Sequence, residues 1–359
     1  MAPRHRYFRP LLLSLIFSTF MLSCMRWDYD NEQEEFDSSS SGLFILCEGN
    51  FQYGNASLSY YDPVTNQVEN NVFFRANGMK LGDVAQSMTI HDGKGWIVVN
   101  NSSVIFAIDP STFKEIGRIE GFTSPRYIQF INEEKAYVSQ LWDNRIFIIN
   151  PQKFEITGYI DIPDMAMGSG STESMVLHDG FVYCTCWSYQ NRIVKIDTAT
   201  DKVIGQLEVG IQPSALVIDI NDNLWTITDG GYDGSPAGYE PPKLNKIKLP
   251  EFEIEKTFQF SLGDSPRSLA LNPSGTEIFW INGGVWKMDV EDVRLPVKPF
   301  LESRDTKYYA LTIDPINGEI YVADAIDYMQ SGIVYRYADS GQLIDEFYVG
   351  VTPGAFCWK

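Results

Sequence analysis

A repeated junction along the chain is the feature that most limits what it can fold into. Short apolar segments end in Asp or Asn followed by a turn, at Asp62-Pro63, Asp109-Pro110, Asn150-Pro151 and Asp197-Thr198. The Asp or Asn positions lie 47, 41 and 47 residues apart, a spacing typical of β-propeller blades. Because each repeat buries its face only against its neighbours, a chain of this length can form one repeat domain where two ordinary domains would be expected.

The segments between these junctions predict strands. They are short, rich in β-branched and aromatic residues, and bounded by turn residues. Three complete four-strand copies cover residues 87–121, 126–160 and 174–208, and further copies run over 214–260, 268–303 and 309–350. Asp-Gly turns at His91-Asp92-Gly93 and His178-Asp179-Gly180 close the first hairpin of two copies, as such dipeptides do in β-hairpins.

The two ends of the repeat region complement each other. Residues 43–50, 57–62 and 68–74 supply a second, third and fourth strand without a first, whereas residues 353–358 supply a first strand with nothing after it. Joining them completes one more blade and removes the open sheet edges. We therefore predict an all-β fold, a seven-bladed β-propeller over residues 43–359, with 3+1 strand closure of the terminal blade.

The N-terminus indicates export. Arg4, Arg6 and Arg9 precede an apolar run over residues 11–22, which is too short to span a bilayer but suits a signal peptide. The run ends at Met21-Leu22-Ser23-Cys24, which resembles a bacterial lipobox. We expect a lipoprotein signal peptide over residues 1–23 and acylation of Cys24. An ordinary signal peptide with an incidental cysteine is the alternative.

Residues 24–42 are expected to form a flexible tether. From residue 28 the composition is acidic and then serine-rich, which cannot bury a core. The acidic run also resembles the signal that directs lipoproteins of Bacteroidetes to the outside of the outer membrane. The predicted location is therefore the extracellular face of the outer membrane, held by the lipid, although the run also suits a plain solvated tether.

Charge and cysteine usage exclude several classes. Removing residues 1–23 takes away three arginines and no acid, and lowers the formal net charge from −19 to −22, which argues against nucleic acid as a partner. Cys184 and Cys186 share one face of a strand. Cys47 and Cys357 fall on strands expected to be neighbours, where either a disulfide or two buried thiols is compatible. No Cys or His pairs occur at zinc-ligand spacing, and no metal site is predicted.

Strand order separates the two faces of the ring. The 1–2 and 3–4 turns share one face, which is built of tight turns, while the 2–3 loops and the connections between blades share the other, called the loop face here. His91 and His178 lie beside the tight turns, and His5 belongs to the signal peptide. A Ser/Cys-His hydrolase is therefore not expected, and no catalytic residue is assigned.

The loop face carries long loops rich in aromatic, amide and carboxylate side chains. Aromatic residues cover a large area of a partner, and loops on a rigid scaffold are where binding concentrates. Some of these rings could instead cap the packing between blades. The candidate ligand-binding residues are Phe51, Tyr53, Asp83, Gln86, Arg126, Trp142, Trp187, Tyr189, Gln190, Asn191, Asp229, Tyr232, Tyr308, Asp324, Asp327 and Tyr328.

Six stretches of the chain form long, specific motifs. They are Glu48-Gly49-Asn50-Phe51-Gln52-Tyr53, Gly82-Asp83-Val84-Ala85-Gln86-Ser87-Met88, Cys186-Trp187-Ser188-Tyr189-Gln190-Asn191-Arg192, Thr228-Asp229-Gly230-Gly231-Tyr232, Asp305-Thr306-Lys307-Tyr308-Tyr309 and Pro353-Gly354-Ala355-Phe356-Cys357-Trp358-Lys359. These stretches resemble the BtuG family, surface-exposed cobalamin-capturing lipoproteins of gut Bacteroides. Members are also described as surface layer or YncE-like propellers. The resemblance covers essentially the whole mature chain.

The resemblance implies capture of vitamin B12 and related corrinoids, followed by handover to BtuB, a TonB-dependent outer-membrane transporter. The corrinoid is then a transported ligand, and no cofactor is expected. A corrin is a broad disc rimmed with amide groups, which need acceptors such as Asp83 or Asp229 and donors such as Gln190 or Arg126. With no histidine predicted on the loop face, no protein imidazole is expected to ligate the cobalt.

Two other classes remain compatible with the sequence. Carboxylates on the loop face could hold Ca²⁺ and activate water, as in lactonase or gluconolactonase propellers, although the chain offers no obvious convergent acid–base set. A protein- or glycan-binding scaffold suits the flat face of a propeller equally well. An activity screen with and without EDTA distinguishes a metal-dependent hydrolase from a corrinoid-binding protein. A pull-down from outer-membrane extract distinguishes a protein- or glycan-binding scaffold from it.

Overall fold

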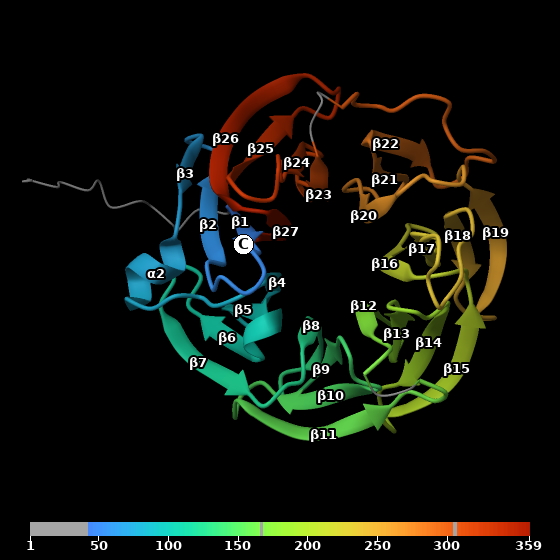
Figure 1. The fold of residues 1–359 in the computed structure, drawn as a ribbon, viewed down its shortest axis with the longest axis horizontal. Coiled ribbons are helices and arrows are strands. Elements are labelled where there is room, and N and C mark those ends of the chain that lie inside the picture. Colours follow the sequence, from blue (N-terminus) through green and yellow to red (C-terminus); the bar gives the residue numbers. More distant parts are fainter. Residues whose placement is uncertain (1–41, 166–167, 304–306) are drawn as a thin grey trace, which may run out of the picture. The chain divides into compact units, whose positions relative to one another are not determined.

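The computed structural model describes residues 42–165, 168–303 and 307–359, all within the compact unit Ser38–Lys359. Seven small antiparallel sheets, each one blade, are arranged in a ring (Figure 1), which confirms the predicted seven-bladed propeller. The predicted signal peptide, the acylation site Cys24, the tether up to residue 41, and Asp305 and Thr306 lie outside the described residues. Within the described ranges, no helix has the length and apolar character needed to cross a membrane.

The blades are numbered in chain order. Blade 1 contains β1 (Leu43–Cys47), β2 (Ser57–Asp62), β3 (Gln67–Glu69) and β27 (Pro353–Trp358). Blade 2 contains β4 (Ala85–His91), β5 (Lys94–Val99), β6 (Val104–Ile108) and β7 (Glu115–Glu120), and blade 3 contains β8 (Pro125–Asn132), β9 (Lys135–Gln140), β10 (Arg145–Asn150) and β11 (Glu155–Asp161). Blade 4 contains β12 (Thr172–His178), β13 (Phe181–Cys186), β14 (Arg192–Asp197) and β15 (Lys202–Glu208).

The remaining blades follow the same order around the ring. Blade 5 contains β16 (Pro213–Ile218), β17 (Asn223–Thr228), β18 (Lys243–Lys248) and β19 (Glu253–Gln259). Blade 6 contains β20 (Arg267–Leu271), β21 (Glu277–Asn282) and β22 (Gly284–Asp289), and blade 7 contains β23 (Tyr308–Ile313), β24 (Ile320–Asp324), β25 (Ser331–Tyr337) and β26 (Leu343–Val351). Within the residues that the structure describes there are also two short helices, α2 (Val72–Asn77) and the 3₁₀ turn η1 (Asn100–Ser102).

Blade 1 joins the two ends of the repeat region, as predicted. The C-terminal β27 pairs antiparallel with β1, and β1 pairs on its other side with β2. The closure continues beyond the strands, because the Glu48 amide donates to the Thr352 carbonyl at 2.9 Å and the Lys359 amide to the Gly42 carbonyl at 2.9 Å. The ring is thus closed by hydrogen bonds between residues from opposite ends of the described sequence.

The core lies between neighbouring blades. The second strands, such as β5 and β13, are buried along almost their whole length because both of their faces pack on another blade. The outermost β15 instead alternates between exposed and half-buried residues, since one of its faces meets solvent. One core cluster, for example, joins Trp96 of blade 2 to Ile128 and Phe147 of blade 3.

Two predicted fourth strands are wrong in part. Residues 68–74 were expected to form one, but β3 ends at Glu69 and α2 follows, because Val72 and Phe73 bury into the protein and the Phe73 ring meets Phe106 at 5.1 Å. Residues 268–303 were expected to hold four strands, but blade 6 has three. Pro296 and Pro299 lack the amide hydrogens that a fourth strand would donate.

The predicted hairpin turns and cysteine placements agree with the structure. Asp92 and Gly93 both have positive φ, at 49° and 67°, which the mirror-image turns of tight hairpins require. The described cysteines Cys47, Cys184, Cys186 and Cys357 are all free. β1 and β27 are neighbours, but Cys357 lies opposite Phe44 and Cys47 opposite Pro353, so the register keeps the two thiols apart.

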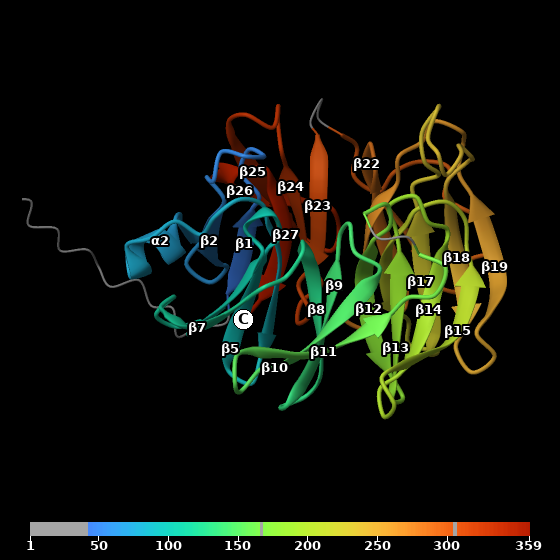
Figure 2. The ribbon, with the colours of Figure 1, turned by 60° about the horizontal axis from the view of Figure 1, so that its bottom comes forward.

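Figure 2 shows how the loops divide between the two ends of the ring. The long loop between β17 and β18 projects from one end, and the β12–β13 turn lies at the other (Figure 2). This arrangement matches the predicted division into a loop face and a face of tight turns.

Candidate functional site

One residue per blade is directed at the axis of the ring. Each is the second residue of the first strand of its blade, and in each case the pairing of that strand with its neighbour shifts register close by. Such β-bulges re-aim side chains and are common beside functional sites. These seven residues, the axial ring, are Gln86, Arg126, Glu173, Ser214, Ser268, Tyr309 and Gly354.

All seven line a cavity of about 350 Å³, the axial pocket. The pocket is completed by residues from the adjoining loops and strands. These are Glu48, Tyr127, Trp187, Ala215, Asp229, Ser265, Pro266 and Arg267. Most of the lining is polar or charged, which indicates a site for a polar group rather than for a hydrocarbon.

The axial pocket contains a buried ion pair between Arg126 and Glu173. Arg126 Nε donates to Glu173 Oε2 at 2.8 Å and to Oε1 at 3.1 Å, and Nη2 also donates to Oε1. The Arg126 and Glu173 side chains are 14% and 5% exposed. The other guanidinium arm donates to Gln86 Oε1. Because the guanidinium is already held by two partners, it is pre-oriented before any ligand arrives.

The ion pair is connected to the loops through Trp187. The Arg126 guanidinium lies over the Trp187 ring, 5.9 Å from its centroid. Trp187 Nε1 donates to Asp229 Oδ2 at 3.1 Å, and Gln212 Nε2 donates to the same carboxylate at 3.0 Å. These contacts join three blades and hold the tryptophan ring in the lining of the axial pocket.

Glu48 is a further carboxyl in the lining of the axial pocket, besides Glu173 and Asp229. Burial raises its pKa to about 7, with Arg126 opposing the rise, and the Tyr309 hydroxyl donates to its Oε2 at 3.4 Å. Its backbone is held by Val84 and Thr352, β-branched residues whose φ values are 61° and 53°. Strained backbone of this kind is kept where the surrounding structure enforces it, often at functional sites.

Glu48 is expected to make the protein less stable as the pH rises through about 7. Its folded-state pKa lies above its ordinary value of 4.5, so the stabilisation is complete below that value and is lost as the carboxyl ionises in the folded protein. Replacing Glu48 by Gln should flatten the pH dependence of the urea midpoint and stabilise the protein by about 1–2 kcal/mol at pH 8, a figure reduced because solvent reaches part of the side chain. An unchanged slope would contradict this, and the exposed turn variant Glu134→Gln is the control.

A second cavity of about 510 Å³ adjoins the first and is called the aromatic pocket. It shares Glu48, Gln86, Arg126, Trp187 and Tyr309 with the axial pocket, so the two form one continuous surface. Its other lining residues are Val84, Leu141, Trp142, Ser188, Tyr189, Gln212 and Tyr232.

Three aromatic rings from the loops form one wall of the aromatic pocket, two of them exposed and one, Tyr189, half-buried. Trp142 and Tyr232 are 42% and 52% exposed, and the centroids of Trp142 and Tyr189 lie 6.4 Å apart. The neighbouring Tyr189 hydroxyl raises the pKa of Tyr232. These rings come from the loops between second and third strands of blades 3, 4 and 5, as the division into two faces predicted.

The structure brings together seven of the predicted binding residues. Gln86, Arg126, Trp142, Trp187, Tyr189, Asp229 and Tyr232 line the two connected pockets. The backbone amide of Gln190 donates to the Trp187 carbonyl at 2.8 Å, whereas Asn191 lines a separate groove. The Tyr328 ring meets Tyr309 edge-on at 5.7 Å, so it lies near the rim.

The other predicted residues lie elsewhere. Phe51 and Tyr53 are exposed at 63% and 71%, but they line neither pocket. The three aspartates bind backbone amides of loops: Asp83 accepts from Gln52, Asp324 from Lys307 and Ile326, and Asp327 from Met329 and Gln330.

The expected exposure of Tyr308 on the loop face is wrong. Its side chain is only 5% exposed and packs in the core that blades 6 and 7 share. The reason is the bulge at the start of β23, which shifts register between Tyr308 and Ala310 and leaves Tyr309 as the residue of the axial ring. The two adjacent tyrosines therefore have opposite environments.

Glu48, Glu173 and Tyr309 were not selected from the sequence. Their position in the repeat could have indicated them, because every axial residue is the second residue of a first strand. However, the residue types at this position differ from blade to blade, so a search for motifs does not find the position. Within the described residues, no group of three or more His, Cys, Asp or Glu side chains is placed to hold a metal ion.

Comparison with solved structures shows the same fold at low sequence identity. A quinoprotein alcohol dehydrogenase-like protein from Bacteroides thetaiotaomicron matches with a TM-score of 0.68 and 14% identity, over 90% of this chain and 79% of that chain. The periplasmic gluconolactonase of Pseudomonas aeruginosa matches with a TM-score of 0.66 and 11% identity, over 89% and 99%. Hydrazine synthase of Kuenenia stuttgartiensis matches with a TM-score of 0.60 and 15% identity, over 76% and 88%.

At these identities the likeness concerns the fold alone. No curated protein matches the chain at a significant level. One family does match nearly all of the propeller: the chain belongs to the family described as "Domain of unknown function (DUF5074)", whose family model matches residues 41–349.

Proposed function

We propose that this protein captures vitamin B12 and related corrinoids on its loop face and passes them to a TonB-dependent outer-membrane transporter of the BtuB type. It would do so as a lipoprotein anchored through Cys24 at the extracellular face of the outer membrane. The observation that carries the proposal is the continuity of the aromatic pocket with the polar axial pocket. The sequence stretches that resemble BtuG supply the identity of the ligand.

The chemistry of the two pockets suits a corrin in complementary ways. The rings of Trp142, Tyr189 and Tyr232 offer apolar area for the faces of the disc. Arg126 can donate to amide carbonyls of the rim, while the Glu173 and Asp229 carboxylates can accept from amide N–H groups. Because the donors and acceptors are already fixed by one another, little ordering is needed on binding.

Titration of the purified protein with cyanocobalamin in a calorimeter tests the proposal. A saturable heat at micromolar concentrations is expected. The absence of any heat at those concentrations would contradict it. Handover requires contact with the transporter, so a TonB-dependent barrel should also be recovered with the protein from outer-membrane extract.

Removing the exposed rings should weaken cyanocobalamin binding strongly. The double variant Trp142→Ala/Tyr232→Ala is expected to raise the Kd by roughly 30-fold or more, as for aromatic hot spots. Both residues are exposed, so the unfolding midpoint should barely change. Tyr348→Ala is the matched control, because that ring is 65% exposed on the outer β26. An unchanged Kd in the double variant would exclude the aromatic pocket as the binding site.

Glu48 favours a hydrolase as the second candidate. A carboxyl whose pKa is raised to about 7 can serve as a general base near neutral pH. A screen against lactones, with and without EDTA, would detect such an activity. Loss of that activity in Glu48→Gln, with cyanocobalamin binding absent, would favour this candidate over corrinoid capture.

A further inference from the structure

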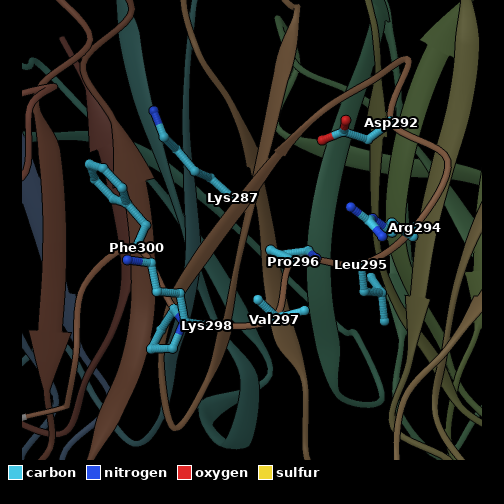
Figure 3. Close-up of a pocket in the computed structure, with 9 residues that line it drawn as sticks. Lys287, Asp292, Arg294, Leu295, Pro296, Val297, Lys298 and Phe300 are labelled. Atoms are coloured by element: carbon cyan, nitrogen blue, oxygen red, sulfur yellow. The ribbon is translucent and has the colours of Figure 1, made fainter.

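Blade 6 differs from the other blades in its outer edge. It ends at β22, its third strand. In the other blades a fourth strand pairs with the third, whereas β22 has no such partner. The segment after β22 returns only at its end: the Val285 amide donates to the Leu301 carbonyl at 2.9 Å, and the Leu301 amide donates to the Val285 carbonyl at 3.0 Å. A cavity of about 430 Å³ separates the rest of that segment from β22 (Figure 3).

The backbone of β22 presents unpaired groups to this cavity. The backbone N–H and C=O groups of every second residue point to the same edge of a strand. Those of Lys287 therefore point to the same edge as those of Val285. The Phe300 amide also donates to the Val285 carbonyl, at 2.8 Å, so the returning segment bulges at this point and does not continue the ladder to Lys287. The next outward amide, that of Asp289, is already capped by Asp292 Oδ2 at 3.0 Å. Among the described residues, no backbone hydrogen bond joins Lys287 to the returning segment.

The cavity has a basic lining, although the chain as a whole is acidic. The formal net charge of the protein is −19, yet the lining residues include Lys287, Arg294 and Lys298 against Asp292 alone (Figure 3). Glu277 already neutralises Lys287, at 2.9 Å, whereas Arg294 and Lys298 are exposed. The outer strands of the other blades instead carry acids, as in the sequences EITGYID of β11 and EIEKTFQ of β19.

We propose that an extended acidic segment of a partner protein docks in this cavity and adds to β22 as the missing fourth strand of blade 6. The Lys287 amide and carbonyl would pair with its backbone, as in other strand additions to sheet edges. Arg294 and Lys298 would bind its carboxylates, and Leu295 and Phe300 would contact the intervening apolar side chains. A peptide strand can pair with both the Lys287 amide and its carbonyl, whereas a small anion can only accept from the amide.

The probe is the peptide acetyl-Glu-Val-Glu-Val-Glu-Val-Glu-amide, added to the purified full chain. Hydrogen exchange should slow in fragments that cover β22 and stay unchanged in β15, the fourth strand of a complete four-stranded blade. Fluorescence anisotropy of the labelled peptide gives the affinity. N-methylation of the central valine removes its amide hydrogen and should weaken binding at least about ten-fold.

A second experiment reverses the charge of the cavity. Arg294→Glu/Lys298→Glu should weaken the Glu peptide at least about ten-fold and favour the matching Lys peptide. Both positions are exposed and lie outside the corrinoid pockets, so cyanocobalamin binding should not change. The proposal is overturned if the Glu peptide fails to slow exchange in β22, or if the methylated and reversed forms bind equally well. It is also overturned if β22 is already protected in a self-associated form of the free protein, because the occupant would then be a second copy of this chain.

Discussion

A chain shortened to end at Thr352 is expected to lose its cooperative unfolding transition. This truncation removes β27, the innermost strand of blade 1, and leaves the inner edge of β1 unpaired. It also removes Phe356 and Trp358 from the core cluster that contains Leu43 and Ile45. The Trp358 ring meets Tyr321 at 5.2 Å, and its Nε1 donates to Thr312 Oγ1 at 3.2 Å.

The size of the loss follows from these contacts. Removing a large buried aromatic side chain costs about 3–5 kcal/mol, and a partly buried ring costs less. Two such rings and a ladder of hydrogen bonds together approach the whole free energy of unfolding of a typical domain, about 5–15 kcal/mol. The shortened chain should therefore expose apolar surface and bind a hydrophobic dye.

Urea unfolding followed by circular dichroism and tryptophan fluorescence checks this prediction. Deletion of Lys359 alone is the control and should change the midpoint little. A synthetic peptide of residues 353–359 should restore a sigmoidal transition to the shortened chain, because it can re-form the pairing with β1. If the shortened chain unfolds cooperatively without the peptide, closure by β27 does not hold the ring.

Arg126→Met is expected to destabilise the protein by about 3–5 kcal/mol, the range measured when one partner of a buried ion pair is removed. Glu173, which is 5% exposed, would then lack its counter-charge, and Gln86 would lose its donor. Urea unfolding at neutral pH measures the loss as a lower midpoint.

Two comparisons separate charge from packing in this experiment. The double variant Arg126→Met/Glu173→Gln removes both charges, so it should recover much of the lost stability. Lys153→Met breaks an exposed ion pair, with Glu155 at 3.9 Å, and should change the stability by less than about 1 kcal/mol. If the double variant is no more stable than Arg126→Met, the loss arises from packing and not from an unpaired carboxylate.

Arg126 contributes both to the stability of the ring and to the proposed binding site. Arg126 closes an ion pair at the axis and also lies over Trp187, which lines the aromatic pocket. A ligand that contacts Arg126 would therefore meet a group held by blades 2, 3 and 4. The proposed peptide site of blade 6 involves different strands, so the two activities can be tested independently.

Much of the fold was determined by the sequence alone. The spacing of Asp62, Asp109, Asn150 and Asp197 indicated the blade repeat, and the incomplete sets of strands at the two ends predicted the closure by β27. Local signals carry this information well, because a turn such as Asp92-Gly93 and the alternation of a strand depend on neighbouring residues. For the same reason, local signals located the loops that hold Trp142, Trp187 and Tyr232.

Only the tertiary structure decided which polar residues meet. Arg126 and Glu173 are 47 residues apart, and their pairing depends on bulges that aim the second residue of each first strand at the axis. Tyr308 and Tyr309 are adjacent, yet one lies in the core and the other in the axial pocket, because one bulge sets their direction. Asp83 and Asp324 looked like ligand acceptors but bind backbone amides of neighbouring segments, those of Gln52 and Lys307. Residue type and spacing cannot separate these outcomes, since they depend on contacts between blades that form only when the ring closes.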